Sequence, residues 1–110
     1  MGLSIHGVVR ELTELLGATT VAVIGGVTET RAVHQWMDDR VPQRTHVLRF
    51  ALQIATMIAS VAERDVARAW FHGSNPRLGD RSPMFMLRDQ KLAEIQFELL
   101  GAARAFVKRV

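Results

Sequence analysis

The sequence predicts an all-α fold, and three stretches of the chain carry that prediction. Residues 5–16 and residues 92–106 repeat apolar side chains at helical spacing, and residues 47–62 are apolar around most of a helix. Only residues 19–26 have the composition of a β-strand. Since one strand cannot form a sheet, we expect helices throughout the chain.

The composition is that of a globular protein. The chain has 110 residues, of which 48% are hydrophobic and 23% charged, so it can form one domain, or two small units that share a core. It has no cysteine, which excludes disulfides, thiol catalysis and cysteine-ligated zinc and fits a reducing cytoplasm. The first residues lack the basic and apolar regions of a secretory signal. We therefore expect a cytoplasmic protein.

The N-terminal part, residues 1–41, is predicted to form three short helices. Ser4 is a good N-cap for the first helix and Gly17 ends it. Local propensity alone predicts a β-strand over residues 19–26, whereas their position between two predicted helices favours a second helix. Thr28 can cap a third helix over residues 29–39, whose apolar face holds Trp36. A tight turn before the third helix is typical of a helix-turn-helix unit.

A nucleotide-binding alternative arises at Gly25 and Gly26, which follow the possible strand. The dinucleotide fingerprint needs glycine at its first, third and sixth positions. Counted from Gly25, the third and sixth positions are Val27 and Thr30. The sequence therefore disfavours a nucleotide fold.

The central part, residues 42–63, is predicted to be one long linking helix. Its polar side chains between residues 47 and 62 follow a single line along a helix: Arg49, Gln53, Thr56 and Ser60. A helix that is apolar over so much of its surface has more area to bury than a few short helices easily provide. We therefore expect a homodimer or a hetero-oligomer.

The C-terminal part, residues 64–110, is predicted to hold three helices and one long loop. The first is a short helix with Val66, Ala69 and Trp70 on one side, and the loop covers residues 73–80. Ser82 and Pro83 are typical of the start of a brief second helix. The last helix is expected over residues 90–107, where Gly101 indicates close packing of the backbone.

The order of these C-terminal motifs resembles the toxin-binding domain of the Xre/MbcA/ParS-like antitoxins, and residues 1–41 resemble the helix-turn-helix unit that usually precedes it. The resemblance rests on sequence elements in a fixed order: Trp70, Asn75-Pro76, Leu78-Gly79, Ser82-Pro83 and Leu87-Arg88. It implies an antitoxin, not an enzyme, whose partner is a RES-domain toxin that degrades NAD. It also implies that the last helix blocks the entrance to the toxin's NAD pocket, and that the helix-turn-helix binds the operon's own promoter.

The predicted toxin-binding residues come from three sources. The resemblance assigns Asn75, Leu78, Arg88 and the end of the last helix, Arg104, Ala105, Phe106 and Val107. Position and charge add the basic tail, Lys108, Arg109 and Val110. A second apolar line on the last helix adds Phe97, Leu100 and Ala105 as a partner-facing surface.

The predicted DNA-binding residues lie on and after the third helix. The exposed start of a recognition helix approaches base edges while basic residues hold phosphates. The base-reading candidates are Thr28, Glu29, Thr30, Arg31, His34 and Gln35, and the phosphate-binding candidates are Arg40, Arg44 and Arg49. Because residues 1–49 carry five arginines against five acids, bulk charge does not favour DNA binding there. A stand-alone transcriptional regulator is the alternative function.

No catalytic constellation is apparent in the sequence. His34 and Asp38 are spaced to share a metal ion on a helix, but no third ligand follows at a suitable spacing. No serine, histidine and acid form a triad pattern. We therefore predict no enzyme activity, no metal site and no cofactor.

Overall fold

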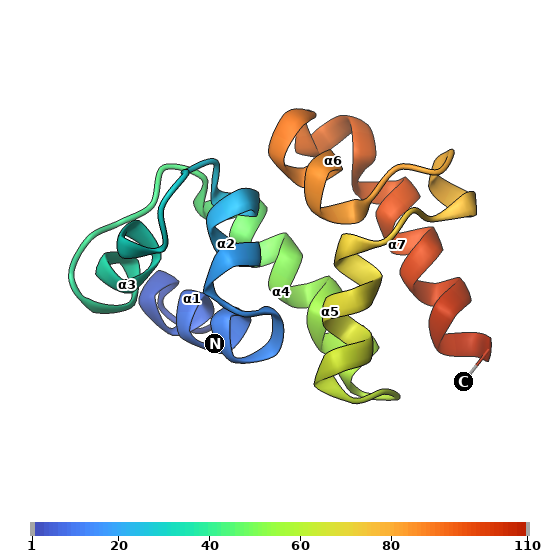
Figure 1. The fold of residues 1–110 in the computed structure, drawn as a ribbon, viewed down its shortest axis with the longest axis horizontal. Helices are drawn as coiled ribbons and strands as arrows, with labels where there is room; N and C mark the ends of the chain where they lie inside the picture. Colours follow the sequence, from blue (N-terminus) through green and yellow to red (C-terminus); the bar gives the residue numbers. More distant parts are fainter. Residues whose placement is uncertain (1, 110) are drawn as a thin grey trace.

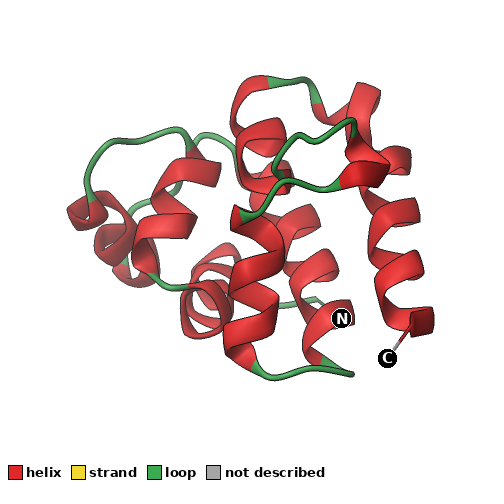
Figure 2. Cartoon of the chain, turned by 45° about the vertical axis from the view of Figure 1, so that its right-hand side comes forward, coloured by secondary structure: helices red, strands yellow, loops and turns green. Residues whose placement is uncertain are grey.

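The computed structural model describes residues 2–109, and within this range the chain is helical without a β-strand (Figures 1 and 2). The predicted all-α fold is confirmed. The seven α-helices are α1 (Ile5–Leu16), α2 (Ala18–Gly25), α3 (Thr30–Asp38), α4 (Thr45–Ala59), α5 (Arg64–His72), α6 (Pro83–Asp89) and α7 (Leu92–Arg109). A 3-10 turn, η1 (Pro76–Leu78), lies in the loop between α5 and α6.

Helix α1 begins and ends where the sequence predicts. The Ser4 hydroxyl accepts a hydrogen bond from the Gly7 amide at 3.1 Å, as an N-cap does. Gly17 follows the last turn with φ 86°, a backbone angle that favours glycine, and its amide donates to the Thr13 carbonyl. Val9 and Leu12 are fully buried on the inner face. The spacing of apolar residues therefore indicated the correct face.

Residues 18–25 form helix α2, so the strand that local propensity favours is not present. Thr20, Val21 and Ile24 are buried, and α2 packs against α1, α3, α4 and α6. A β-branched residue in a helix costs less than about 1 kcal/mol, whereas burying one valine or isoleucine side chain gains about 1.5–3 kcal/mol. Burial therefore outweighs propensity in this segment.

The turn between α2 and α3 is tight and contains a left-handed glycine. Gly26 has φ 81°, and its amide donates back to α2. Glu29 occupies the N-cap position of α3 without a side-chain hydrogen bond, so the predicted Thr28 cap is wrong. Val33 and Trp36 are buried, as predicted for the apolar face.

Helix α4 runs through the middle of the molecule, between α1–α3 on one side and α6–α7 on the other (Figure 1). It is shorter than expected, because residues 40–44 form a loop before Thr45. The predicted polar line is correct: Arg49, Gln53, Thr56 and Ser60 are all exposed. The opposite faces pack against α1, α2, α5 and α7 within one continuous core.

Helix α5 faces the core with different residues from those predicted. Ala67 and Phe71 are buried, while Val66 is 42% exposed and Ala69 is also exposed. Trp70 lies at the edge, in edge-to-face contact with Phe71 at a centroid distance of 5.3 Å. The buried Ala67 and Phe71 follow the predicted Val66 and Trp70 by one position, so the face that α5 turns to the core is rotated by about 100° from the predicted face.

The start of α6 and the inner face of α7 follow the sequence prediction. The Ser82 hydroxyl accepts a hydrogen bond from the Phe85 amide, and Pro83 is the first residue of α6. Ile95 and Leu99 of α7 are buried against the core. Gly101 does not make the predicted close contact, since a Cβ atom there would meet nothing within 4 Å.

The glycine whose backbone lies against a neighbouring side chain is instead Gly25, at the end of α2. A Cβ atom on Gly25 would lie 2.7 Å from the ring of Trp36, which is 7% exposed. This contact lets α2 and α3 approach closely enough for the tight turn at Gly26. The close packing of α2 against α3 therefore depends on a glycine–tryptophan contact.

We predict opposite effects of alanine at the two glycines. Gly25→Ala should lower the free energy of unfolding by about 1–3 kcal/mol, because the Trp36 ring must move in a packed core. Gly101→Ala, the matched control, should raise it by about 0.5–1 kcal/mol, because alanine favours a helix interior and meets open space. Urea unfolding followed by circular dichroism measures both changes, and a neutral Gly25→Ala would contradict the importance of this contact.

Candidate functional site

A cleft between η1 and the end of α7 brings together several of the predicted toxin-binding residues. Its cavity volume is about 190 Å³. The lining residues come from α5, the following loop and α7: Trp70, Ser74, Asn75, Pro76, Arg77, Ala102, Ala105, Phe106 and Arg109. The cleft thus combines a partly buried aromatic wall with two arginines, and no acidic side chain lines it.

The loop that forms one wall of this cleft is held in place by Asn75 and Arg81. The Asn75 side-chain oxygen accepts a hydrogen bond from the Arg77 amide at 3.0 Å, and the backbones of Asn75 and Arg81 form an isolated bridge. The Arg81 guanidinium donates to the Leu78 carbonyl at 2.6 Å and to the Glu98 carboxylate at 2.8 Å. Glu98 belongs to α7, so this contact fixes the distance between the loop and the helix.

Two of the predicted residues, Leu78 and Asn75, hold the loop beside the cleft in place. Leu78 has an exposed fraction of 0%, so a direct contact with a partner is not available to it and that prediction needs correction. A leucine in a turn is apolar enough to become a core residue, as Leu78 does here. Asn75 lines the cleft, but its side-chain oxygen already caps the 3-10 turn.

Arg88 lies at the end of α6 and does not reach the cleft. Its guanidinium pairs with the Asp89 carboxylate at 2.6 Å and lies 4.6 Å from the centre of the exposed Phe85 ring. The hydrogen bond from Arg88 holds the pKa of the Asp89 carboxyl below its ordinary value, and the nearby positive charges of Arg88 and Arg44 act in the same direction. Arg88 therefore belongs to a second surface, at the junction of α6 and α7.

The outer face of α7 is partly apolar and ends in positive charge. Phe97 is 78% exposed, whereas Leu100 is half-buried and packs against the core. Arg104 and Lys108 are exposed, and Val107 is half-buried. The predicted residue Val110 lies outside the described residues.

The predicted base-reading residues are collected at the N-terminal end and outer face of α3. All of them are exposed: Thr28, Glu29, Thr30, Arg31, His34 and Gln35. Arg40, in the loop after α3, is exposed as well. Their proximity to DNA stays a prediction.

Arg44 has a structural role that the sequence did not indicate. Its guanidinium donates to the Ile24 carbonyl at 3.0 Å, the Leu87 carbonyl at 2.7 Å and the Arg88 carbonyl at 3.0 Å. These carbonyls are near the C-terminal ends of α2 and α6, where helices lack intrahelical donors. Arg44 therefore joins the two halves of the molecule, and the guanidinium is not free to hold a phosphate in this conformation.

Arg49 also makes a hydrogen bond within the protein. One guanidinium nitrogen donates to the Leu3 carbonyl at 2.9 Å, while the side chain stays exposed. It lies on α4 rather than on α3, and its contact with a phosphate stays a prediction.

The cleft is also lined by Trp70, Ser74 and Arg77, which are not among the site residues predicted from the sequence. The sequence did predict a loop over residues 73–80, which begins two residues after Phe71. In the structure Arg81, directly after this loop, contacts Glu98 of α7. Nothing in the sequence indicated that this loop would pack against the end of α7. The cleft therefore depends on tertiary structure.

We predict that Arg44→Lys lowers the free energy of unfolding by about 1–3 kcal/mol. The planar guanidinium of arginine donates to carbonyl groups of two helix ends at once, and the ammonium group of lysine cannot reproduce this geometry. Arg40→Lys is the matched control, because the exposed side chain of Arg40 makes no hydrogen bond to residues 2–109, and its backbone amide, which bonds to the Gln35 carbonyl, is unchanged by the substitution. It should change stability by less than about 0.5 kcal/mol. Thermal and urea unfolding compare the two variants, and equal effects would argue against the bridging role.

No helix within residues 2–109 is long and apolar enough to cross a membrane. The same residues contain no group of three or more histidine, aspartate or glutamate side chains placed to hold a metal ion.

Comparison with known proteins identifies a similar solved structure. The sequence matches no family model and no curated protein. The structure is similar to a chain in the crystal structure of the M. tuberculosis MbcT-MbcA toxin-antitoxin complex, with a TM-score of 0.70 and 26% sequence identity. The match covers 94% of this chain and 97% of that chain. The resemblance to the MbcA-like antitoxins that the sequence predicted is therefore confirmed over nearly the whole chain.

Proposed function

We propose that this protein is the antitoxin of a toxin–antitoxin system. The observation that supports the proposal is the similarity of 94% of the chain to a component of a toxin–antitoxin complex of nearly the same length. The order of the motifs in residues 64–110 favours the same function independently of the structure. We propose that the protein acts by binding, without catalysis, and that it works in the cytoplasm.

We further propose that the partner is a RES-domain toxin and that the end of α7 blocks the entrance to its NAD pocket. The cleft between η1 and α7 provides a binding surface beside that helix end, with the aromatic side chains of Trp70 and Phe106 and the charges of Arg77 and Arg109. Such a surface favours a partner segment with acidic groups next to apolar ones. The exposed Phe97 gives a second apolar anchor on α7.

Charge reversal in the cleft tests this assignment. The double variant Arg77→Glu and Arg109→Glu should weaken inhibition of the toxin by about tenfold or more, because a glutamate at each position repels acidic groups of the partner. Removal of residues 104–110 should abolish inhibition. Both effects are measured as the rate of NAD consumption by the toxin, which is first separated from the antitoxin and then mixed with each antitoxin variant.

Arg31→Glu on α3 is the matched control, since it reverses one exposed arginine far from the cleft in sequence. It should inhibit the toxin as the unmodified protein does. Circular dichroism must show the helical fold in every variant. Unchanged inhibition by both the charge-reversed and the truncated proteins would refute the proposed role of this surface.

Promoter binding is a second proposed activity of the same antitoxin, or the main one if the chain has no toxin partner. It is favoured by the tight turn at Gly26 between α2 and α3 and by the exposed polar side chains that begin α3. Arg31 is suited to guanine and Gln35 to adenine in a major groove. Arg44 is omitted from this proposal because its guanidinium joins α2 and α6.

We predict that Arg31→Ala weakens binding to the operon's promoter, with a loss of about 1–3 kcal/mol if the side chain reads a base. Fluorescence anisotropy at several salt concentrations measures affinity and its salt dependence. The Arg77→Glu and Arg109→Glu double variant should bind the promoter unchanged. Unmodified protein that shows no salt-sensitive DNA binding would exclude this activity.

A further inference from the structure

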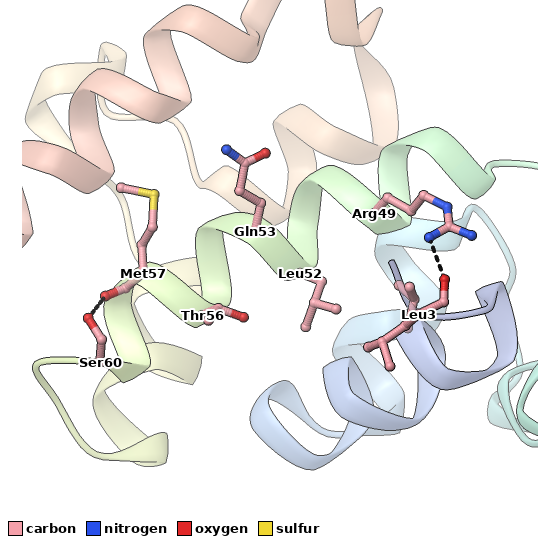
Figure 3. A pocket seen from close by; sticks show the side chains of 8 residues that line it. Leu3, Arg49, Leu52, Gln53, Thr56, Met57 and Ser60 are labelled. Carbon is pink, nitrogen blue, oxygen red and sulfur yellow. Dashed lines mark hydrogen bonds between the residues drawn. The ribbon is translucent and has the colours of Figure 1, made fainter. Parts of the chain in front are cut away.

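Helix α4 borders two hollows to which the proposed function assigns no role. One is a largely apolar groove between the start of the chain and α4, where Arg49 donates to the Leu3 carbonyl (Figure 3). The other lies between the first turn of α4 and the junction of α6 with α7, and its volume is about 580 Å³. We call it the junction cleft, and its lining residues are Arg44, His46, Val47, Arg88, Asp89, Gln90, Lys91, Leu92 and Ala93.

The lining of the junction cleft is mostly polar and carries an excess of positive charge. Three lining residues are cationic, namely Arg44, Arg88 and Lys91. Asp89 is the acidic residue of the lining and pairs with Arg88, while the exposed Glu94 lies on the first turn of α7 outside the lining. The three apolar lining residues are buried, half-buried or as small as alanine. The cleft therefore favours an anion over an apolar protein segment, which needs a larger anchor.

Three side chains of the junction cleft have donors available for an anion. Lys91 is exposed and forms no ion pair within residues 2–109. Arg88 uses its Nε and Nη2 atoms on Asp89, which leaves Nη1 without a partner among those residues. The ring of His46 is exposed and can donate a hydrogen bond. The Arg44 guanidinium is held by three backbone carbonyls, but its positive charge remains in the cleft.

The junction cleft adjoins the turn that leads into α3. The Cδ atom of Arg44 lies 3.4 Å from the position of a Cβ atom added to Gly26, and the base-reading candidates begin two residues later, at Thr28. A major groove that admits a helix is about 12 Å wide, with a phosphate backbone along each side. The longest extent of the molecule is 38 Å, close to one turn of DNA. One duplex is therefore long enough to contact both α3 and the junction cleft.

We propose that the junction cleft binds a backbone phosphate of the DNA that α3 reads, through the charge of Lys91 and hydrogen bonds from Arg88 and His46. The DNA-binding surface thus extends from α3 to the start of α7. A phosphate contact adds affinity and carries no sequence information. The inference rests on the promoter-binding part of the proposed function, and it does not depend on the toxin.

The test compares Lys91→Ala with Lys108→Ala in the full chain. Both remove one exposed lysine, but Lys108 lies about 25 Å farther along α7 and serves as the matched control. Fluorescence anisotropy measures affinity over a range of salt concentrations for a promoter duplex and for an unrelated duplex of equal length. Lys91→Ala should weaken binding to both duplexes by about fivefold or more at about 0.1 M salt. It should also reduce the slope of log affinity against log salt by about 0.9, whereas Lys108→Ala should change neither quantity.

Asp89→Asn should act in the opposite direction, because it removes the carboxylate that competes with the phosphate for Arg88. We expect binding to both duplexes to tighten by about twofold or more. Circular dichroism verifies that each variant keeps the helical fold.

Three results would each overturn the inference: equal losses in the two lysine variants, unchanged binding by Lys91→Ala, or no gain from Asp89→Asn. The promoter-binding proposal survives any of these results if Arg31→Ala still weakens binding to the promoter. Unmodified protein without salt-sensitive DNA binding would overturn both proposals together.

Discussion

The burial of α4 is the constraint on which the rest of the structure depends. Leu48, Ile54 and Ile58 have exposed fractions of 0–1%, and each fully buried side chain of this size contributes about 1.5–3 kcal/mol. No single short helix could cover these faces, so α1, α2, α5 and α7 pack around α4 from different directions. The N-terminal and C-terminal parts of the chain therefore share one core, and neither is held in place by local interactions alone.

Arg44 determines how the two parts meet at the start of this helix. A loop that follows α3 must carry the chain into α4 while the ends of α2 and α6 lie close by, each with unsatisfied carbonyl groups. One planar guanidinium donates to both ends. A charged side chain is well suited to this position because helix C-termini carry partial negative charge. The interaction connects the α2–α3 unit with α6, and so with the C-terminal surfaces.

The functional surfaces lie on different elements, which separates their chemistry. The cleft at the end of α7 is positively charged and aromatic, and the start of α3 is polar and exposed. The surfaces proposed for the toxin and for the promoter therefore share no residue. The toxin-binding and promoter-binding activities proposed for the protein are separable by substitution for this reason.

The sequence by itself determined the helical class, both ends of α1, the start of α6, and the polar line of α4. These features depend on local spacing and on capping chemistry that a few neighbouring residues supply, such as Ser4 with Gly7 or Ser82 with Pro83. The resemblance of the motif order to known antitoxins was also available from the sequence, because it needs no coordinates. The candidate residues at the end of α7 followed from that order.

Only the tertiary structure decided the helical state of residues 18–25, the buried face of α5, the burial of Leu78 and the composition of the cleft. In each case the deciding contacts join residues far apart in the chain, as between Gly25 and Trp36 or between Arg44 and the end of α6. Propensity differences of less than about 1 kcal/mol per residue are too small to predict such outcomes. Burial and hydrogen bonding across the fold are larger, and their partners are unknown until the helices are assembled.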